Sequence, residues 1–361
     1  MSHAGIKVLM VCGGTGGHIY PAMAIADSLK RMGADQIVFA GRKDSMEEKL
    51  VAPYWNFETI TAVPLVRGSL KHNLSLPWKL FTSYLRAKAV IRKVKPSFVV
   101  ATGGYVSLPV ILAAGIAHIP VYLQEQNAVA GVANRIGARF AKRIFVTSAD
   151  AAKAFPATKC KIHGNPVRQM PTPGSLPVPT EFEKATFNVL VLGGSQGARG
   201  INEKLEAQLK RIGESKEITV VWQAGAKNVT PIQQRAQIPE NVTITSFLNP
   251  VYAYMDSADL LVSRAGASTI AEILAFGKPS ILFPFPFATA NHQEFNARVL
   301  ERAGAALVEL DDEPNGLWDK VERLCNNPAE LKQMAAQARS LGMPDAADRI
   351  AKDILAEELR A

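Results

Sequence analysis

Short apolar runs alternate with amphipathic stretches along most of this chain. Each run is too short for a helix, and the stretches between the runs carry apolar residues at helical spacing. The predicted strands are residues 8–11, 36–41, 98–101, 121–123 and 143–146 in the first half, and 188–192, 218–222, 242–245, 260–263, 280–284 and 306–310 in the second. The predicted helices are 21–32, 78–94, 132–140, 269–276, 293–302 and the stretch from 328 onward. This alternation predicts an α/β fold with parallel sheets covered on both faces.

The two halves of the chain open in the same way. Residues 8–18 and 188–198 each run from a strand through a glycine loop into a helix, and residues 164–186 between the halves are rich in proline. We predict two Rossmann-like, doubly wound domains at 1–165 and 187–340, a linker at 166–186, and a C-terminal helix at 341–361 that packs back on the first domain. Ligands of doubly wound sheets lie at the carboxyl ends of strands, so both loops are expected to face one interdomain cleft.

Positive charge is concentrated in the first half. The formal net charge is +9, and Glu125 is the sole acidic residue between Glu58 and Asp150. Apolar side chains are interleaved with lysines and arginines over residues 67–95, which suits an anionic membrane surface. The predicted membrane contacts are Lys71, Leu74, Leu76, Trp78, Lys79 and Phe81. A solvated basic helix explains the same pattern, and nucleic acid, the weakest of the three interpretations, is not predicted as a partner.

Several classes of protein are excluded by the cysteines and by the longest apolar run. The three cysteines are far apart and lack a C-x-x-C pair, which argues against a disulfide framework or a zinc site. No D-x-D pair occurs either, so we predict no metal and no cofactor. The apolar run at 110–123 is interrupted and too short to span a bilayer, and no signal peptide precedes the first strand. We therefore expect a cytoplasmic protein.

Two residues of the first half are candidates for proton transfer. His18 follows the glycine loop at the mouth of the first helix, where it is either a general base toward a hydroxyl or a structural histidine. Glu125 follows an apolar strand and is the second candidate, for a base or for substrate binding. The glycine loop and the helix start favour an anionic or hydroxyl-rich ligand.

The second half carries two candidate phosphate-binding turns. Residues 263–272 pass from a strand through small residues into a helix, so a diphosphate could reach the helix start while Glu272 binds ribose hydroxyls. A capping box formed by Thr269 and Glu272 is the structural alternative. Ser195 lies in a G-S-Q-G turn that lacks the partners of a nucleophile, so we interpret it as a phosphate donor. Arg168, at the start of the linker, is either a cleft residue or a plain surface arginine.

Taken together, the motifs resemble those of the MurG family of N-acetylglucosaminyltransferases. The similar segments are 13–18 (GGTGGH), 102–107 (TGGYVS), 125–127 (EQN), 164–168 (GNPVR), 193–198 (GGSQGA) and 263–269 (SRAGAST), in the same order along nearly the whole chain. This resemblance implies a GT-B fold and inverting, metal-independent transfer of N-acetylglucosamine from UDP-N-acetylglucosamine to the C4 hydroxyl of the muramoyl sugar of lipid I, giving lipid II. It also implies peripheral attachment to the cytoplasmic face of the cell membrane.

The resemblance also implies a set of site residues. Donor contacts fall on Thr15, Gly16, Gly17, Asn127, Arg168, Ser195, Leu248, Ala267, Ser268, Thr269, Ile270, Ala271, Glu272 and Gln293. In this set Leu248 contacts uracil through its backbone, Glu272 the ribose, and Gln293 the sugar hydroxyls. The chain departs from the family pattern at Gln124, where histidine is usual, and at His292, where a second glutamine is usual.

His18 and Glu125 remain alternatives for the base that takes the acceptor proton. Another GT-B enzyme, such as a diacylglycerol glycosyltransferase or a UDP-N-acetylglucosamine 2-epimerase, is the second interpretation of the sequence. A membrane-bound scaffold that has lost turnover is the third, and the intact His18, Glu125, Glu272 and Gln293 argue against it.

Overall fold

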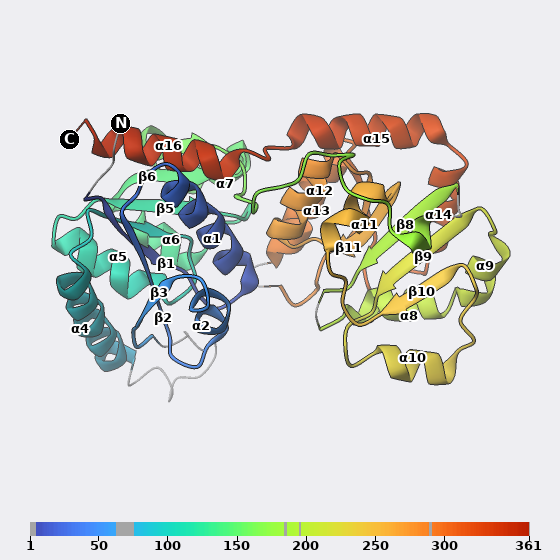
Figure 1. The fold of residues 1–361 in the computed structure, drawn as a ribbon, viewed down its shortest axis with the longest axis horizontal. Coiled ribbons are helices and arrows are strands. Elements are labelled where there is room, and N and C mark those ends of the chain that lie inside the picture. Colours follow the sequence, from blue (N-terminus) through green and yellow to red (C-terminus); the bar gives the residue numbers. More distant parts are fainter. Residues whose placement is uncertain (1–4, 63–75, 184–185, 195, 289–290, 361) are drawn as a thin grey trace. The chain divides into compact units, whose positions relative to one another are not determined.

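A computed structural model describes residues 5–62, 76–183, 186–194, 196–288 and 291–360, with the side chains of residues 76 and 77 excepted. The chain divides into two compact units. Unit 1 comprises residues 1–169 and 343–361, and unit 2 comprises residues 170–342 (Figure 1). The segment predicted as a linker contributes its first residues to unit 1 and the remainder to unit 2.

Unit 1 is built on a parallel sheet that has seven strands among the described residues, in the order β3-β2-β1-β4-β5-β6-β7. The strands are β1 (Lys7–Val11), β2 (Gln36–Gly41), β3 (Asn56–Thr59), β4 (Phe98–Ala101), β5 (Val121–Glu125), β6 (Ala141–Val146) and β7 (Cys160–Ile162). The helices are α1 (Gly16–Arg31), α2 (Met46–Val51), α4 (Leu76–Val94), α5 (Ser107–Ile116), α6 (Val132–Gly137), α7 (Ala149–Ala152) and α16 (Ala346–Glu358).

Both faces of this sheet are buried, which explains its continuous apolar runs. Leu9 and Val11 point into one core with residues of α4 and α5, whereas Val8 and Met10 point into the other with α1 and α16. Helix α16, from the far end of the chain, lies beside α1 and inserts Ile350 and Ile354 into that second core (Figure 1).

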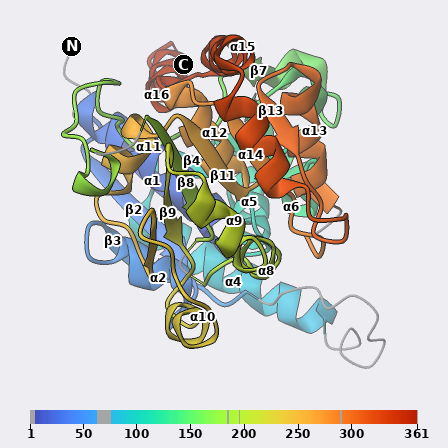
Figure 2. The same cartoon turned by 90° about the vertical axis from the view of Figure 1, so that its right-hand side faces the viewer.

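Unit 2 repeats the plan with a parallel sheet in the order β10-β9-β8-β11-β12-β13. Its strands are β8 (Phe187–Leu192), β9 (Ile218–Gln223), β10 (Val242–Thr245), β11 (Leu260–Arg264), β12 (Ser280–Phe283) and β13 (Ala306–Val308). Its helices are α8 (Arg199–Glu206), α9 (Leu209–Glu214), α10 (Val229–Arg235), α11 (Val251–Ser257), α12 (Ala267–Phe276), α13 (His292–Arg302), α14 (Leu317–Cys325) and α15 (Pro328–Leu341). Helices α8, α9 and α14 cover one face, in front of the strands in Figure 2, and α11, α12 and α13 cover the other.

The strand order creates one switch point in each sheet. The order reverses between β1 and β4 in unit 1 and between β8 and β11 in unit 2, so the loops after these strands leave in opposite directions and open a crevice. Glycine-rich segments that begin at Gly13 and Gly193 follow β1 and β8. Both candidate sites therefore begin at a switch point.

Helix α1 begins earlier than the sequence predicts. The apolar pattern suggests a start at Pro21, but the helix begins at Gly16 with Thr15 as its N-cap. Gly16 and Gly17 form its first turn, where backbone N–H groups have no partner within the helix. No helix in the described parts of the chain is both long and apolar enough to cross a membrane.

Candidate active site

Two glycine loops of unit 1 touch each other at the switch point. A Cβ atom on Gly104, in the loop after β4, would lie 2.2 Å from the carbonyl oxygen of Gly13, in the loop after β1. Gly104 also has a φ of +82°, which favours glycine. A side chain at this position would force the loops apart, so glycine is required there.

His18 lies in the first turn of α1 and turns its ring toward the loops after β4 and β5. Its Nδ1 atom is 3.0 Å from the carbonyl oxygen of Thr102 and 3.0 Å from Oε1 of Gln126. The Thr102 hydroxyl donates in return to the His18 carbonyl oxygen at 2.8 Å. Three separate segments of the chain thus fix one half-buried imidazole.

Glu125, at the end of β5, is 1% exposed and organises the loop that follows it. Its Oε1 accepts hydrogen bonds from the backbone and side-chain nitrogens of Asn127, at 3.1 and 3.3 Å. Its Oε2 accepts from the backbone nitrogen of Gly131 at 3.0 Å and from Nδ2 of Asn134 at 2.9 Å. Both carboxylate oxygens are therefore engaged in holding residues 127–134.

Arg168 lies against the same helix start. Its guanidinium carbon is 4.5 Å from the ring centroid of Tyr20, and the Tyr20 ring in turn borders Gly16, where a Cβ atom would be 3.1 Å from it. Unit 1 thus brings together Thr15, Gly16, Gly17, His18 and Arg168 around the N-terminus of α1, with Asn127 on the loop that Glu125 holds.

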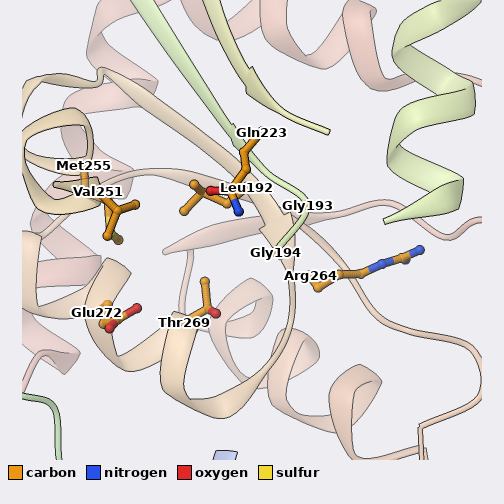
Figure 3. Close-up of a pocket in the computed structure, with 9 residues that line it drawn as sticks. All are labelled: Leu192, Gly193, Gly194, Gln223, Val251, Met255, Arg264, Thr269 and Glu272. Carbon is orange, nitrogen blue, oxygen red and sulfur yellow. The ribbon is translucent and has the colours of Figure 1, made fainter. Parts of the chain in front are cut away.

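Unit 2 has a cavity of about 180 Å³ at the carboxyl ends of its central strands (Figure 3). Its lining residues are Leu192, Gly193, Gly194, Gln223, Val251, Met255, Arg264, Thr269 and Glu272. Gly194 has a φ of +75°, and a Cβ atom there would meet nothing within 4 Å. The loop after β8 therefore presents backbone to open space.

Helix α12 supplies the two predicted residues that line this cavity, Thr269 and Glu272. The capping-box alternative is wrong, because the N-cap is Gly266, without a side-chain cap, and Thr269 is the third residue of the helix. Oε1 of Glu272 accepts a hydrogen bond from the Tyr252 hydroxyl at 3.0 Å. The buried Ser268 hydroxyl has no hydrogen-bond partner in the structure.

Other predicted residues lie elsewhere in unit 2. Leu248 is packed in the apolar core beside α11 and α12, and Ser195 lies outside the described residues. Oε1 of Gln293, in the first turn of α13, accepts the backbone N–H of Phe285 at 3.0 Å. Ala267, Ile270 and Ala271 belong to α12 but do not line the cavity.

Sequence reasoning missed several lining residues. Val251 and Met255 come from α11, which faces the cavity opposite α12, and Gln223 ends β9 (Figure 3). Arg264 points away from Glu272 and forms a two-contact ion pair with Asp311, at 2.6 and 2.8 Å. In the described residues, no group of three or more histidine, cysteine or acidic side chains could hold a metal ion.

Comparison with known proteins places both units in one family. Residues 8–146 match the glycosyltransferase family 28 N-terminal domain, and residues 188–350 match its C-terminal domain. A protein of Desulfitobacterium hafniense named UDP-N-acetylglucosamine–N-acetylmuramyl-(pentapeptide) pyrophosphoryl-undecaprenol N-acetylglucosamine transferase is 39% identical, over 96% of this chain and 98% of its own. The chain belongs to the MurG family. A protein of Halothermothrix orenii with the same name is 38% identical, over 94% and 95% of the two chains.

A solved structure supports the same assignment. The crystal structure of Acinetobacter baumannii MurG is 28% identical and covers 97% of this chain and 99% of its own, with a TM-score of 0.79. The predicted α/β fold of GT-B type and the predicted resemblance to the MurG family are both confirmed.

Proposed function

We propose that this chain transfers N-acetylglucosamine from UDP-N-acetylglucosamine to the C4 hydroxyl of the muramoyl sugar of lipid I, giving lipid II. The observation that carries the proposal is similarity over nearly full length to relatives named for this reaction. The two candidate sites agree with it chemically. One has a carboxylate and a helix start suited to a nucleotide, and the other has a histidine suited to a hydroxyl.

The donor binds in the cavity of unit 2 in this proposal. Glu272 accepts hydrogen bonds from the ribose, and the backbone of Gly194 meets the diphosphate with Ser195 and the first turn of α12, from Ala267 to Thr269. The backbone N–H of Gly193 already donates to the Gln223 carbonyl oxygen at 3.0 Å. The backbone of Leu248 contacts the uracil. Oε1 of Gln293 already accepts a hydrogen bond, so its amide hydrogens are the groups that donate to sugar hydroxyls.

The reaction is a displacement with inversion at the anomeric carbon. The acceptor C4 oxygen forms a bond to that carbon, the bond to the diphosphate oxygen breaks, and UDP leaves with the electron pair. We assign His18 as the base that takes the hydroxyl proton. Glu125, whose two oxygens accept four hydrogen bonds, holds the Asn127 loop in place.

Membrane attachment is the second part of the proposal. Trp78 is 69% exposed and Phe81 is 50% exposed, and their ring centroids lie 5.9 Å apart on α4. Lys79 lies between them in sequence, and the predicted contacts Lys71 and Leu74 lie outside the described residues, as does the side chain of Leu76. Exposed aromatic rings beside cations suit an anionic bilayer surface on the cytoplasmic side.

A transfer assay tests the main proposal. Labelled N-acetylglucosamine is supplied on UDP with lipid I or a short-chain analogue, in the presence of excess chelator. We expect labelled lipid II. Transfer to diacylglycerol instead, or epimerisation without an acceptor, would refute the acceptor assignment, and failure to bind the donor would refute the donor site.

Vesicle binding tests the membrane proposal. The double variant Trp78→Ala/Phe81→Ala removes two exposed rings, and we expect about a 10-fold or greater loss of binding to anionic vesicles, with transfer to a water-soluble acceptor unchanged. Tyr54→Ala, which removes a ring that is 75% exposed on the segment after α2, is the matched control. An equal loss of vesicle binding in the double variant and in Tyr54→Ala would refute a specific membrane-binding face.

A further inference from the structure

A hydrogen-bonded network of three buried amide side chains adjoins His18. Gln124, Gln126 and Asn165 are each less than a tenth exposed. Nε2 of Gln126 donates to Oε1 of Gln124 at 2.6 Å, and Nε2 of Gln124 donates to Oδ1 of Asn165 at 3.3 Å. This network runs from Asn165, in the segment after β7, through Gln124 in β5 and Gln126 just after it, to the ring of His18.

The contacts determine how the Gln126 amide is oriented. One end of this amide lies 2.5 Å from the Thr102 carbonyl oxygen and 2.6 Å from Oε1 of Gln124. A carbonyl oxygen only accepts hydrogen bonds, so the end facing the Thr102 carbonyl is the NH₂ group. The other end, Oε1, therefore faces Nδ1 of His18 at 3.0 Å.

Nδ1 of His18 is thus surrounded by acceptors. It lies 3.0 Å from Oε1 of Gln126 and 3.0 Å from the Thr102 carbonyl oxygen, and neither oxygen carries a hydrogen. A neutral imidazole has one N–H group, and the hydrogen bond made by one ring nitrogen decides which nitrogen carries it. The hydrogen must be on Nδ1, which makes Nε2 the basic nitrogen of the ring.

We propose that Gln126 is a positioning residue that holds His18 in the Nδ1–H tautomer, so that Nε2 takes the proton of the acceptor hydroxyl. This inference rests on the proposed function, in which His18 is the base. Gln126 acts through His18, and its own amide has no part in the transfer. Gln124 and Asn165 keep Gln126 from turning over, because a turned amide would place its oxygen against two other oxygens. Amides do not titrate, so the orientation of Gln126 does not depend on the protonation of its own side chain or of Gln124 and Asn165.

The tautomer can be measured without any assay of activity. The full chain is labelled with ¹⁵N histidine, the His18 signals are identified by their loss in His18→Gln, and spectra are recorded at a pH where histidine is neutral. We expect a protonated Nδ1 and an unprotonated Nε2 in the native protein. In Gln126→Leu, we expect a substantial fraction of the Nε2–H form. A native Nε2–H form would overturn the proposal, as would an unchanged tautomer in Gln126→Leu.

Kinetics give the second readout. Gln126→Leu should lower kcat about 10-fold or more and leave the KM for the UDP donor within about 2-fold, because the donor cavity is in unit 2. Ser28→Ala is the control, since it removes a part-buried hydrogen bond of 2.6 Å to Asp348 from the same helix α1. An equal fall of kcat in this control would overturn the role of Gln126.

Two more variants keep the outcomes distinct. If Gln126→Leu does not fold, Gln124→Met removes one of the two acceptors that orient Gln126, together with the hydrogen bond from Gln124 to Asn165, and leaves the Thr102 carbonyl oxygen in place. It should therefore change tautomer and kcat in the same direction by less. An unchanged tautomer and kcat in Gln124→Met would then overturn the proposal. If His18→Gln retains full kcat, the assignment of His18 as base fails and the catalytic role of Gln126 fails with it, whereas the spectra still decide the tautomer.

Discussion

The carboxylate of Glu272 gives the sharpest test of the donor site. Glu272→Gln keeps one side-chain oxygen to accept from the Tyr252 hydroxyl, so the packing of α12 against α11 is retained. It removes the negative charge that the proposal directs at the ribose. A hydrogen bond to a charged group contributes roughly 1.5–3 kcal/mol, so UDP binding should weaken by about 10- to 150-fold.

Calorimetric titration with UDP and with 2′-deoxy-UDP makes this prediction specific. The native chain should bind the deoxy nucleotide more weakly, and Glu272→Gln should lose most of that discrimination, because the partner of the missing hydroxyl is already gone. Glu203→Gln, which changes an exposed acid of the same unit that pairs with Arg199, is the matched control. Equal weakening of both nucleotides in Glu272→Gln would refute ribose recognition.

The remaining predictions concern two paired carboxylates, the buried Glu309 and the half-buried Asp353. Glu309 is 1% exposed and accepts from Nζ of Lys204 at 2.6 Å, so Glu309→Gln should lower the free energy of unfolding by about 3–5 kcal/mol, as urea denaturation would show. Burial alone would raise the pKa of Asp353, but hydrogen bonds from Lys161 and His163 outweigh it and hold this pKa below its usual value. A lowered pKa stabilises the folded chain above the unfolded value of about 3.9, so this contribution should be lost as the pH falls below that value. In Asp353→Asn, the melting temperature should fall less steeply as the pH is lowered through the acid range.

Each stability prediction has an outcome that contradicts it. Glu309 pairs with Lys204 and also with Lys320. A cost below about 1 kcal/mol in Glu309→Gln would mean that these two lysines are not held by charge. If the melting temperature falls equally steeply at acid pH with and without the Asp353 carboxyl, other carboxylates dominate acid unfolding.

The strands that the sequence predicts best are those that are buried on both faces. In β1 and β4 every side chain after Lys7 is buried, so the apolar run is continuous and its length identifies a strand. The edge strand β3 has an exposed or half-exposed residue at each position and carries no such signal. The hydrophobic pattern also fails to predict helix α2, because one of the residues that this helix buries is an acid, Glu47. Its carboxylate accepts hydrogen bonds from the backbone of Gly14 and from Arg42.

The site residues that the sequence predicts are likewise those whose local sequence carries a signal. His18, Thr269 and Glu272 lie directly after glycine turns, where local sequence indicates a strand end and a helix start. Gln126 meets His18 across 108 positions of sequence, and Gln124 meets Asn165 across 41. No local pattern reports such contacts, since they depend on which strands become neighbours in the sheet.

The glycine loops themselves serve two purposes that sequence cannot separate. A side chain on Gly104 would clash with the Gly13 carbonyl oxygen, and one on Gly193 would come within 2.6 Å of the Gln223 carbonyl oxygen. These two glycines are therefore required for the close approach of neighbouring loops. Gly194 faces open space on its Cβ side while lining the cavity. Gly104 lets the two loops at the switch point of unit 1, after β1 and β4, close on each other, and Gly193 lets the ends of the neighbouring strands β8 and β9 approach closely. Gly194 leaves its backbone available for a ligand. Substituting Gly104 or Gly193 should therefore lower stability, and substituting Gly194 should lower donor affinity.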